Sequence, residues 1–349
     1  MRDDDIDEIM VNGPGKIFVD RHGKLVLTGR TFVNADQVKA VIDRILMPVG
    51  RTVNERTPFV DARLADGSRV HAIIPPLSLL GPMVTIRKFA KVPYSIEDLI
   101  YRFKTMTPKV AEFLKLCVRL RKNIIVSGGA SSGKTTLLNV LSNYINPDER
   151  VITIEDSAEL RLSQENIGRL EARNQGMEAK TQVTIRDLVR NSLRMRPDRI
   201  VVGECRGAEA LDMLQAMNTG HDGSLTTLHA NTSRDALARL ETMVLMAGVD
   251  LPLRAIREQI AGAVNIIVQA NRLADGSRKI LEVVEVTGIE ENTIKTEAIY
   301  RFEKKWIGED GTVVGEIAPT GTIPHFIREM PGNLAEKVAN LFQTEVRNS

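Results

Sequence analysis

The chain has 349 residues, enough for two or three domains that each bury a core of their own. Its 47 Lys and Arg residues nearly balance its 45 Asp and Glu residues, so the net charge of +2 argues neither for nor against a nucleic-acid partner. Aromatic residues make up only 4% of the chain, which disfavours a base-stacking surface for single strands.

Other features of the composition concern the cellular compartment. The two cysteines, Cys117 and Cys205, have no metal-ligand spacing and are interpreted as reduced thiols. The chain has no uncharged apolar run of about 18 residues, and its acidic amino terminus lacks the apolar core of a signal peptide. We therefore expect a cytoplasmic protein that associates with a membrane only through partners.

Residues 1–92 are predicted to form a small α/β domain. Its short strands are separated by turn residues, and its helix has apolar residues at helical spacing. In chain order, the predicted elements are strands over 9–11, 16–19 and 24–27, a helix over 34–47, and strands over 59–64, 69–74 and 84–89. The last three strands carry Arg63, Arg69 and Arg87. Because exposed arginines are common, ordinary solvated charge is one interpretation of this group.

Residues 93–106 are predicted to be an interdomain linker that includes a short helix over 95–103. Residues 107–349 alternate apolar strands with helices, which is typical of a mainly parallel sheet covered by helices. The predicted strands cover 123–126, 151–155, 199–203, 224–228, 265–269, 279–287 and 293–302, and the predicted helices cover 107–122, 136–141, 184–195, 208–217, 233–247, 252–263 and 334–342. In such sheets the ligand lies outside the carboxyl ends of the parallel strands.

The segment 123–139, NIIVSGGASSGKTTLLN, fits a phosphate-binding loop between a buried strand and a helix. Its glycines let backbone N–H groups surround an anion, Lys134 reaches the β- and γ-phosphates, and the Thr135 hydroxyl can bind Mg²⁺. The predicted nucleotide ligands are Gly128, Gly129, Ala130, Ser131, Ser132, Gly133, Lys134, Thr135 and Thr136, together with Arg63, Arg69 and Arg206. The expected cofactors are therefore ATP and Mg²⁺.

Two carboxylate clusters follow predicted strands of the second domain. Glu204 follows RIVVG, where a Walker B acid belongs although Asp is the usual residue, and Glu155 and Glu159 come at the end of VITIE and just after it. We predict that Glu159 polarises the attacking water and that Glu204 and Glu155 belong to the metal shell. The roles of Glu159 and Glu204 can be exchanged, and acidic residues after a strand can instead be helix N-caps.

Basic residues near the same strand ends complete the candidate site. His229 follows SLTTL directly, and it either projects at the site or is a satisfied structural group. Arg206 can pair with Glu204, bind the phosphates or form a structural salt bridge. An arginine finger normally arrives from outside the P-loop core. The arginines of the first domain are therefore the natural suppliers, from the same chain or from a neighbouring subunit.

Long motifs of the chain resemble one family. GGASSGKTT, TIEDSAEL, the run from RPDRIVVGECRG to SLTTLHANT, and LPLRAIREQIA are similar to motifs of the type II/type IV secretion ATPase superfamily, and most of all to its CpaF/TadA-like Tad (Flp) pilus assembly group. The resemblance includes EIMVNGPGKIFVDRHG and GPMVTIRKF in the first domain. It implies a hexameric ring of RecA-like ATPase domains, each with a smaller PAS-like N-terminal α/β domain. Such a ring powers assembly, and in some members retraction, of a pilus through an inner-membrane platform protein.

The resemblance also implies roles for individual residues. It makes 128–135 the Walker A motif, 155–159 the Asp box with Glu159 as its second glutamate, Glu204 the Walker B glutamate, His229 part of the His box, and Arg87 a phosphate-contacting residue from the N-terminal side. Ser157 stands where related ATPases commonly have Pro.

Two other classes of function remain open. RecA-like cores also serve nucleic-acid motors and recombinases, although the near-neutral charge and the few aromatics argue against that function here. A nucleotide-sensing scaffold that binds ATP without hydrolysing it is disfavoured by the carboxylates. The expected partners are further copies of the chain and a membrane platform protein, with no nucleic acid.

Overall fold

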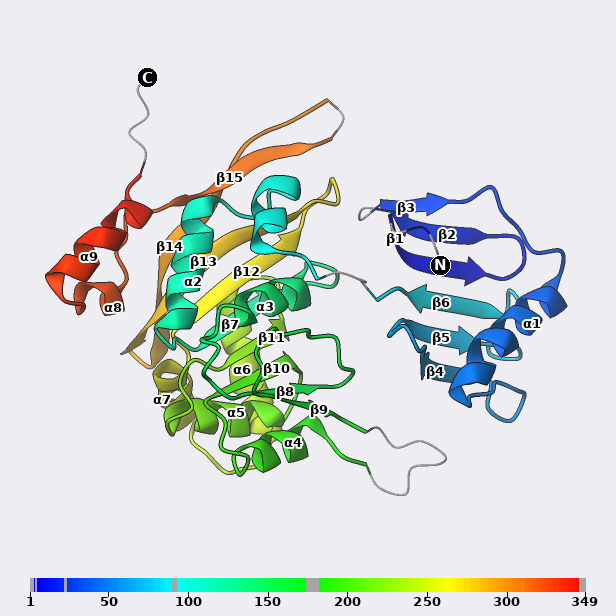
Figure 1. Ribbon diagram of the computed structural model, residues 1–349, viewed down its shortest axis with the longest axis horizontal. Coiled ribbons are helices and arrows are strands. Elements are labelled where there is room, and N and C mark those ends of the chain that lie inside the picture. Colours follow the sequence, from blue (N-terminus) through cyan, green and yellow to red (C-terminus); the bar gives the residue numbers. More distant parts are fainter. Residues whose placement is uncertain are drawn as a thin grey trace. The chain divides into compact units, whose positions relative to one another are not determined.

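The chain divides into two units, Met1–Val92 and Pro93–Ser349, and each is described here by itself (Figure 1). The computed structural model describes residues 3, 5–21, 24–89, 93–173, 182–309 and 311–344. None of the helices among these residues is both long and apolar enough to cross a membrane.

The first unit is a six-stranded antiparallel sheet with a helix on one face. Its elements are β1 (Ile6–Asn12), β2 (Ile17–Arg21), β3 (Lys24–Leu27), α1 (Ala35–Leu46), the short 3-10 helix η1 (Met47–Val49), β4 (Phe59–Arg63), β5 (Arg69–Ile73) and β6 (Met83–Arg87). The strand order is β3-β2-β1-β6-β5-β4. The side chain of Asn34 caps α1 by accepting a hydrogen bond from the backbone N–H of Gln37 (2.9 Å), as its residue type favours.

The register of the first sheet separates a buried face from an open one. Ile9, Ile86, Val70 and Ala62 lie side by side across the strands and belong to the core of this unit, together with the apolar residues of α1. Because neighbouring residues of a strand point to opposite faces, the residues between them lie on the other face. The small α/β domain predicted from the sequence is therefore present, with each of its predicted strands.

The second unit is built on a nine-stranded sheet. Its elements are η2 (Asp98–Arg102), α2 (Pro108–Arg119), β7 (Ile124–Gly128), α3 (Lys134–Ser142), β8 (Val151–Glu155), β9 (Ile167–Glu171), α4 (Ile185–Ser192), β10 (Arg199–Cys205), α5 (Glu209–Asn218), β11 (Leu225–His229), α6 (Ser233–Met246), α7 (Leu253–Ala263), β12 (Ile266–Arg272), β13 (Arg278–Glu290), β14 (Thr293–Ile307), β15 (Val313–Pro319), α8 (His325–Arg328), α9 (Gly332–Val338) and η3 (Ala339–Phe342). The strand order is β15-β14-β13-β12-β7-β11-β10-β8-β9. The six strands from β12 to β9 in that order are parallel, and β13, β14 and β15 extend the sheet in antiparallel pairs.

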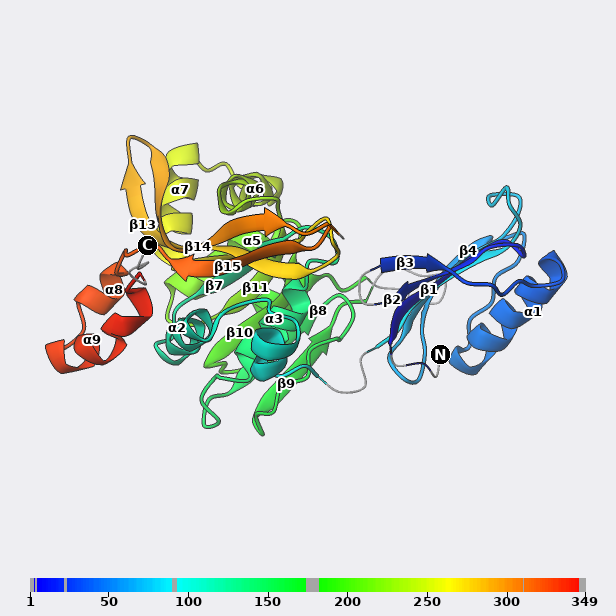
Figure 2. The same cartoon turned by 90° about the horizontal axis from the view of Figure 1, so that it is seen from above.

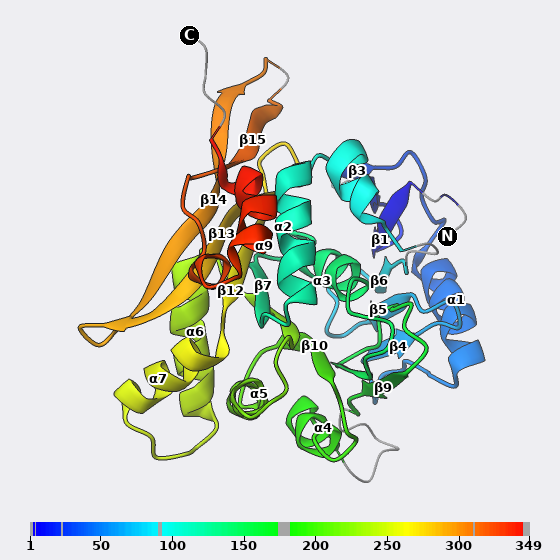
Figure 3. The same ribbon diagram turned by 60° about the vertical axis from the view of Figure 1, so that its left-hand side comes forward.

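Helices cover both faces of this sheet (Figure 2). Buried residues of α2 and α3 pack on one face, and buried residues of α4, α5, α6 and α7 pack on the other. The carboxyl-terminal helices pack beside α2 on the first of these cores (Figure 3). There, Phe113 of α2 stacks with Phe326 and contacts Phe342 edge-on. The α/β class and the covered parallel sheet predicted from the sequence are confirmed.

Some predicted elements differ from the observed ones. Residues 93–106, the expected linker, are grouped with the second unit, and Ile96, Leu99 and Met106 are buried in its core. The helix expected over 95–103 is mainly a π-helical segment, η2. The structure also contains β9 and β15, which the sequence does not predict. Neither has the continuous apolar run that marks the central strands.

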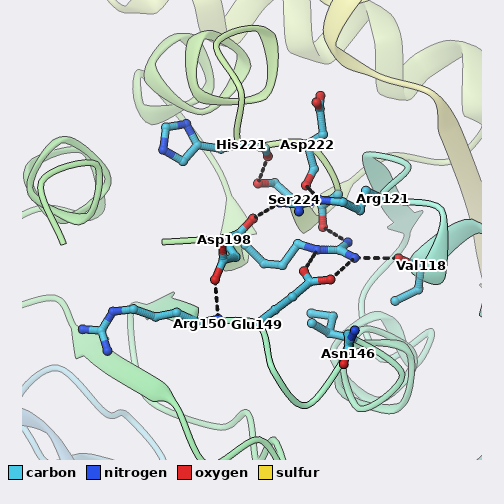
Figure 4. Close-up of polar contacts among 12 residues, drawn as sticks. Val118, Arg121, Asn146, Glu149, Arg150, Asp198, His221, Asp222 and Ser224 are labelled. Carbon is cyan, nitrogen blue, oxygen red and sulfur yellow. Dashed lines mark hydrogen bonds and ion pairs between the residues drawn. The ribbon is translucent and has the colours of Figure 1, made fainter. Parts of the chain in front are cut away.

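A buried polar network lies at the amino-terminal ends of the parallel strands (Figure 4). Arg199, the first residue of β10, is fully buried and forms an ion pair with Glu149. It also donates hydrogen bonds to the carbonyl oxygens of Gly223 (2.9 Å) and Val118 (2.8 Å). A Cβ on Gly223, whose φ is +81°, would lie 1.9 Å from the Arg199 Nη1 atom, so only glycine fits there.

Candidate functional site

The phosphate-binding loop predicted from the sequence lies between β7 and α3. Its first residue, Gly128, has no room for a side chain, since a Cβ there would lie 2.2 Å from the carbonyl oxygen of Ala270. Ser131 and Gly133 have φ values of +55° and +91°, in the left-handed region that reverses the chain direction. Such a turn lets successive N–H groups converge at the N-terminus of α3, the arrangement that binds a phosphate.

Lys134 is the first residue of α3 and is buried, with 9% of its surface exposed. Its Nζ atom donates a hydrogen bond to the carbonyl oxygen of Gly129 (2.7 Å), so the ammonium group lies against the loop. Thr135 and Thr136 follow in the first turn of α3, where the helix dipole adds partial positive charge. The structure thus gathers the predicted phosphate ligands into one loop and one helical turn.

Glu155 ends β8 and is 3% exposed. Its Oε2 atom accepts hydrogen bonds from the backbone N–H groups of Glu159 (2.7 Å) and Leu160 (2.9 Å). Its Oε1 atom is buried and has no hydrogen-bond partner within the described part of the chain. Burial raises the pKa of Glu155 above its ordinary value, and the two backbone N–H groups offset part of that rise.

Glu204 lies on β10, the strand beside β8. The preceding residue, Gly203, packs on Glu155, since a Cβ there would lie 3.0 Å from the Glu155 Cγ atom. The Glu204 carboxylate pairs with Arg206 (2.6 Å), and this hydrogen bond raises the pKa of the guanidinium. The backbone N–H of Arg206 donates to Glu209 (2.6 Å), which holds the segment after β10 in place. Of the options left open for Arg206, the structure shows the ion pair with Glu204.

His229 ends β11 beside the phosphate-binding loop, in register with Gly128 of β7. Burial lowers the pKa of His229 below its usual value of about 6.5, and the positive charge of Lys134 lowers it further. The negative charge of Glu204 acts in the opposite direction. The His229 imidazole therefore lies within the electrostatic reach of both the loop lysine and the β10 carboxylate.

The donors at this edge of the sheet fit Mg²⁺ bound together with a nucleotide. Among the described residues, no group of three or more His, Cys, Asp or Glu side chains could hold a metal ion by itself. Mg²⁺ commonly uses one or two carboxylates and substrate phosphates as ligands. The unpaired Oε1 atom of Glu155, the hydroxyl of Thr135 and the carboxylate of Glu204 would serve here, and the buried Ser132 hydroxyl also lacks a partner in the described structure.

The three candidate arginines of the first unit form one row on the open face of its sheet. Arg63 of β4 lies opposite Arg69 of β5, and Arg69 lies opposite Arg87 of β6. Beyond Arg87, the row continues with Glu8 of β1. Arginine side chains are well suited to bind phosphate, because their guanidinium groups can donate paired hydrogen bonds. Because these arginines belong to the first unit, their contact with a nucleotide stays a prediction.

Two residues that the motifs do not mark also contact the loops of the site. Arg278 of β13 donates a hydrogen bond from Nε to the carbonyl oxygen of Ser131 (2.9 Å). Gln269 of β12 is buried, and its Nε2 atom donates to the carbonyl oxygen of Asn231 (3.0 Å), just beyond His229. The hairpin that carries both is predictable from the ADGS turn, but its place beside the P-loop strand follows from nonlocal pairing.

This arrangement defines a class of protein: a P-loop nucleotide-binding protein with acids from neighbouring parallel strands at the loop. The chain belongs to the family of type II/IV secretion system proteins, whose sequence profile matches residues 1–305.

Particular relatives agree with this membership, and a solved structure shares the fold. The chain is 34% identical over 301 residues to the conjugal transfer protein TrbB of Rhizobium radiobacter, covering 85% of this chain and 88% of that protein. It is 34% identical over 282 residues to a putative conjugal transfer protein of Mycobacterium tuberculosis, covering 79% of each. The X-ray structure of the Legionella pneumophila ATPase DotB has the same fold, with a TM-score of 0.58 and 22% identity over 81% of this chain and 77% of that one.

Proposed function

We propose that the chain is a hexameric motor ATPase that couples Mg-ATP hydrolysis to the assembly, or also the retraction, of a Tad-type pilus. It would work at the cytoplasmic face of the inner membrane through a platform protein. The observation that carries the ATPase proposal is the convergence of a phosphate-binding loop with carboxylates from β8 and β10 at one edge of the sheet. Family membership and the fold shared with an ATPase support it.

We propose the following roles for the residues of this site. The loop N–H groups and Lys134 bind the phosphates, Glu204 and Glu155 belong to the metal shell, and Glu159 orients the attacking water. Glu204, Glu155 and Thr135 would hold Mg²⁺, which would supply positive charge to the transferring phosphoryl group. His229, neutral at about pH 7 because of its lowered pKa, can accept or donate a hydrogen bond near the γ-phosphate without adding charge.

We further propose that Arg63 and Arg69 are nucleotide ligands and that Arg87 acts as the arginine finger. A planar guanidinium group can donate two hydrogen bonds to one phosphate group. Three such groups can therefore contact successive phosphates of a nucleotide. An arginine at this position would couple the nucleotide state to the position of the first unit, which is what a motor requires. The row would come from the same chain or from a neighbour in the ring.

A second candidate function is conjugal transfer, because the two relatives compared above are named as conjugal transfer proteins. The same ATPase would then power a different membrane assembly. In the organism of origin, a deletion strain complemented with the Lys134→Ala variant distinguishes the two. Loss of surface pili supports the Tad pilus, and loss of plasmid transfer with normal pili supports conjugation. A strain that keeps both processes contradicts the proposed motor.

The ATPase proposal is tested by phosphate release from the purified chain with and without Mg²⁺. Glu204→Gln is expected to lower turnover at least about 100-fold and to shift its Mg²⁺ dependence, whereas Glu159→Gln lowers kcat with little change in that dependence. Glu112→Gln, an exposed position on α2, is the matched control. Full turnover in Glu204→Gln would remove the assignment.

The finger role of Arg87 and the ring are tested separately. Arg87→Ala is expected to lower kcat about 1,000-fold with a smaller change in nucleotide affinity, as for other arginine fingers. Arg51→Ala, an exposed arginine outside the row, is the control. Light scattering with a non-hydrolysable ATP analogue should report six copies, and a monomer that hydrolyses ATP at the full rate contradicts the ring.

A further inference from the structure

The phosphate-binding loop is also held from outside, by the antiparallel hairpin β12–β13. Arg278, the first residue of β13, donates the hydrogen bond to the Ser131 carbonyl oxygen described above (2.9 Å). Its Cδ atom lies 3.5 Å from the position that a Cβ of Gly133 would occupy. On the other arm of the hairpin, Ala270 pairs with Gly128. The hairpin therefore contacts the loop at its beginning, middle and end.

The contact at Ser131 has a geometric consequence for the phosphate site. The carbonyl of Ser131 and the N–H of Ser132 belong to the same planar trans peptide, so they point in opposite directions. A donor that fixes the carbonyl on the outside of the loop thereby fixes the Ser132 N–H toward the inside. Ser131 needs such support, because a left-handed φ of +55° is unfavourable for a non-glycine residue.

We propose that Arg278 is a positioning residue for nucleotide binding: it holds the 131–132 peptide so that the Ser132 N–H points to the phosphates. This inference rests on the proposed function, because the loop must bind a nucleotide for its shape to matter. Arg278 acts through the loop. Its loss therefore weakens binding of ADP and ATP alike and leaves the chemical step nearly unchanged.

The test compares three variants by calorimetric titration with Mg-ADP and by steady-state hydrolysis. Arg278→Met keeps an unbranched side chain over Gly133 but removes every donor, and Arg278→Lys keeps one. A single bond to a carbonyl does not need the guanidinium fork, so the lysine variant is expected to recover most of the affinity. Arg272, the cross-strand neighbour of Arg278, is exposed, and Arg272→Met is the matched control.

We expect Arg278→Met to raise the Kd for Mg-ADP and the KM for ATP about 10-fold, with kcat within about twofold of wild type. Arg278→Lys should stay within about threefold and Arg272→Met should match wild type. The inference is overturned if Arg278→Met binds Mg-ADP as tightly as Arg272→Met. It is also overturned if Arg278→Met lowers kcat with an unchanged KM, because that result indicates a role in the chemical step.

A second measurement separates this inference from the proposed function. Amide hydrogen exchange of the nucleotide-free protein should be faster for the peptide that covers 127–134 in Arg278→Met than in Arg272→Met. If the wild-type chain binds no nucleotide and this difference is present, the ATPase proposal fails and the holding of the loop by Arg278 stands. If the wild-type chain binds Mg-ADP and the two variants exchange alike, the inference fails and the ATPase proposal stands.

Discussion

The two edges of the parallel sheet in the second unit both bury polar side chains, but the hydrogen bonding of these side chains differs between the edges. At the amino-terminal edge, Arg199 is bonded to Glu149 and to two carbonyl oxygens. Asn123 in the same region accepts from Gly223 N (2.7 Å) and Ser224 N (2.9 Å). At the carboxyl-terminal edge, a carboxylate oxygen of Glu155 and the hydroxyl of Ser132 are buried without partners among the described residues.

We interpret the bonded groups as holding the fold and the unpartnered Glu155 and Ser132 atoms as available to a ligand, and His221 Nδ1 in the amino-terminal network is likewise buried without a partner among the described residues. A buried polar atom without a partner costs roughly 1–3 kcal/mol, so folding alone does not favour it. A buried oxygen without a protein partner keeps its lone pairs available for a metal ion or another ligand. We therefore expect the amino-terminal network to matter mainly for stability and the carboxyl-terminal edge to matter mainly for ligand binding.

The largest expected effect on stability comes from removing the buried cation of the amino-terminal edge, which tests whether this edge stabilises the fold. Arg199→Ala should lower the free energy of unfolding by about 3–5 kcal/mol, because it leaves the Glu149 charge unpaired. Turnover per folded molecule should stay within about twofold of wild type. Urea unfolding measures the first effect and phosphate release the second. Arg254→Ala, which removes an exposed ion pair with Glu258, should change stability by less than about 1 kcal/mol and is the control.

The matching change at the carboxyl-terminal edge is Lys134→Ala. Turnover should fall at least about 100-fold, because a charge that stabilises the transferring phosphoryl group is lost. The free energy of unfolding should change by less than about 1.5 kcal/mol, unlike that of the Arg199 variant. Urea unfolding in the absence of nucleotide, run beside the phosphate-release assay, measures both. A loss of stability as large as that of Arg199→Ala would mean that both edges are structural.

The sequence predicts this carboxyl-terminal edge well because its signals are local. The loop pattern lies within a few consecutive residues. The run VITIE ends in Glu155, and the runs RIVVG and SLTTL are followed directly by Glu204 and His229. The parallel order of the strands then follows from their alternation with helices. The fold class, the phosphate-binding loop and the positions of the carboxylates at the strand ends therefore follow from the sequence.

What the sequence could not predict depends on pairing between distant segments. The turn at 65–68 places Arg63 opposite Arg69, but the alignment of Arg87 with them depends on how β5 pairs with β6, which no local pattern specifies. The contact of Arg278 with the loop likewise depends on β12 lying beside β7. The amino-terminal network was missed because an arginine at a strand start usually indicates a solvated end, whereas Arg199 is buried.

A smaller effect tests whether the unpaired carboxylate is costly to the fold. The raised pKa of Glu155 means that the folded state binds its proton more tightly than the unfolded state does. Its contribution to stability is therefore complete below the unfolded pKa, about 4.3, and is lost as the pH rises through the folded value. Glu155→Gln should be about 1 kcal/mol more stable than wild type at about pH 7, measured without Mg²⁺.

The control for Glu155→Gln is the same stability measurement made at acidic pH. The advantage of the variant should shrink as the pH falls toward about 4, where the wild-type carboxyl is also neutral. Turnover of the variant should drop, since the amide is a poorer ligand for Mg²⁺ than a carboxylate. A variant that is less stable than wild type at neutral pH would mean that the carboxylate is bound within the protein itself, as Arg199 is at the opposite edge.

The smallest expected effect concerns His229, whose pKa is lowered by burial and by the charge of Lys134. The contribution of a group with a depressed pKa is present above the unfolded value, about 6.5, and is lost as the pH falls through the folded value. Because His229 is only partly buried, His229→Asn should reduce the loss of stability between about pH 7 and pH 5 by less than about 1 kcal/mol. His71→Asn, at an exposed position of the first unit, is the control. Chemical unfolding across this pH range checks the expectation. An equal acid response in both variants would show that the imidazole gains its charge at no cost, and the positive field inferred around the loop lysine would then be wrong.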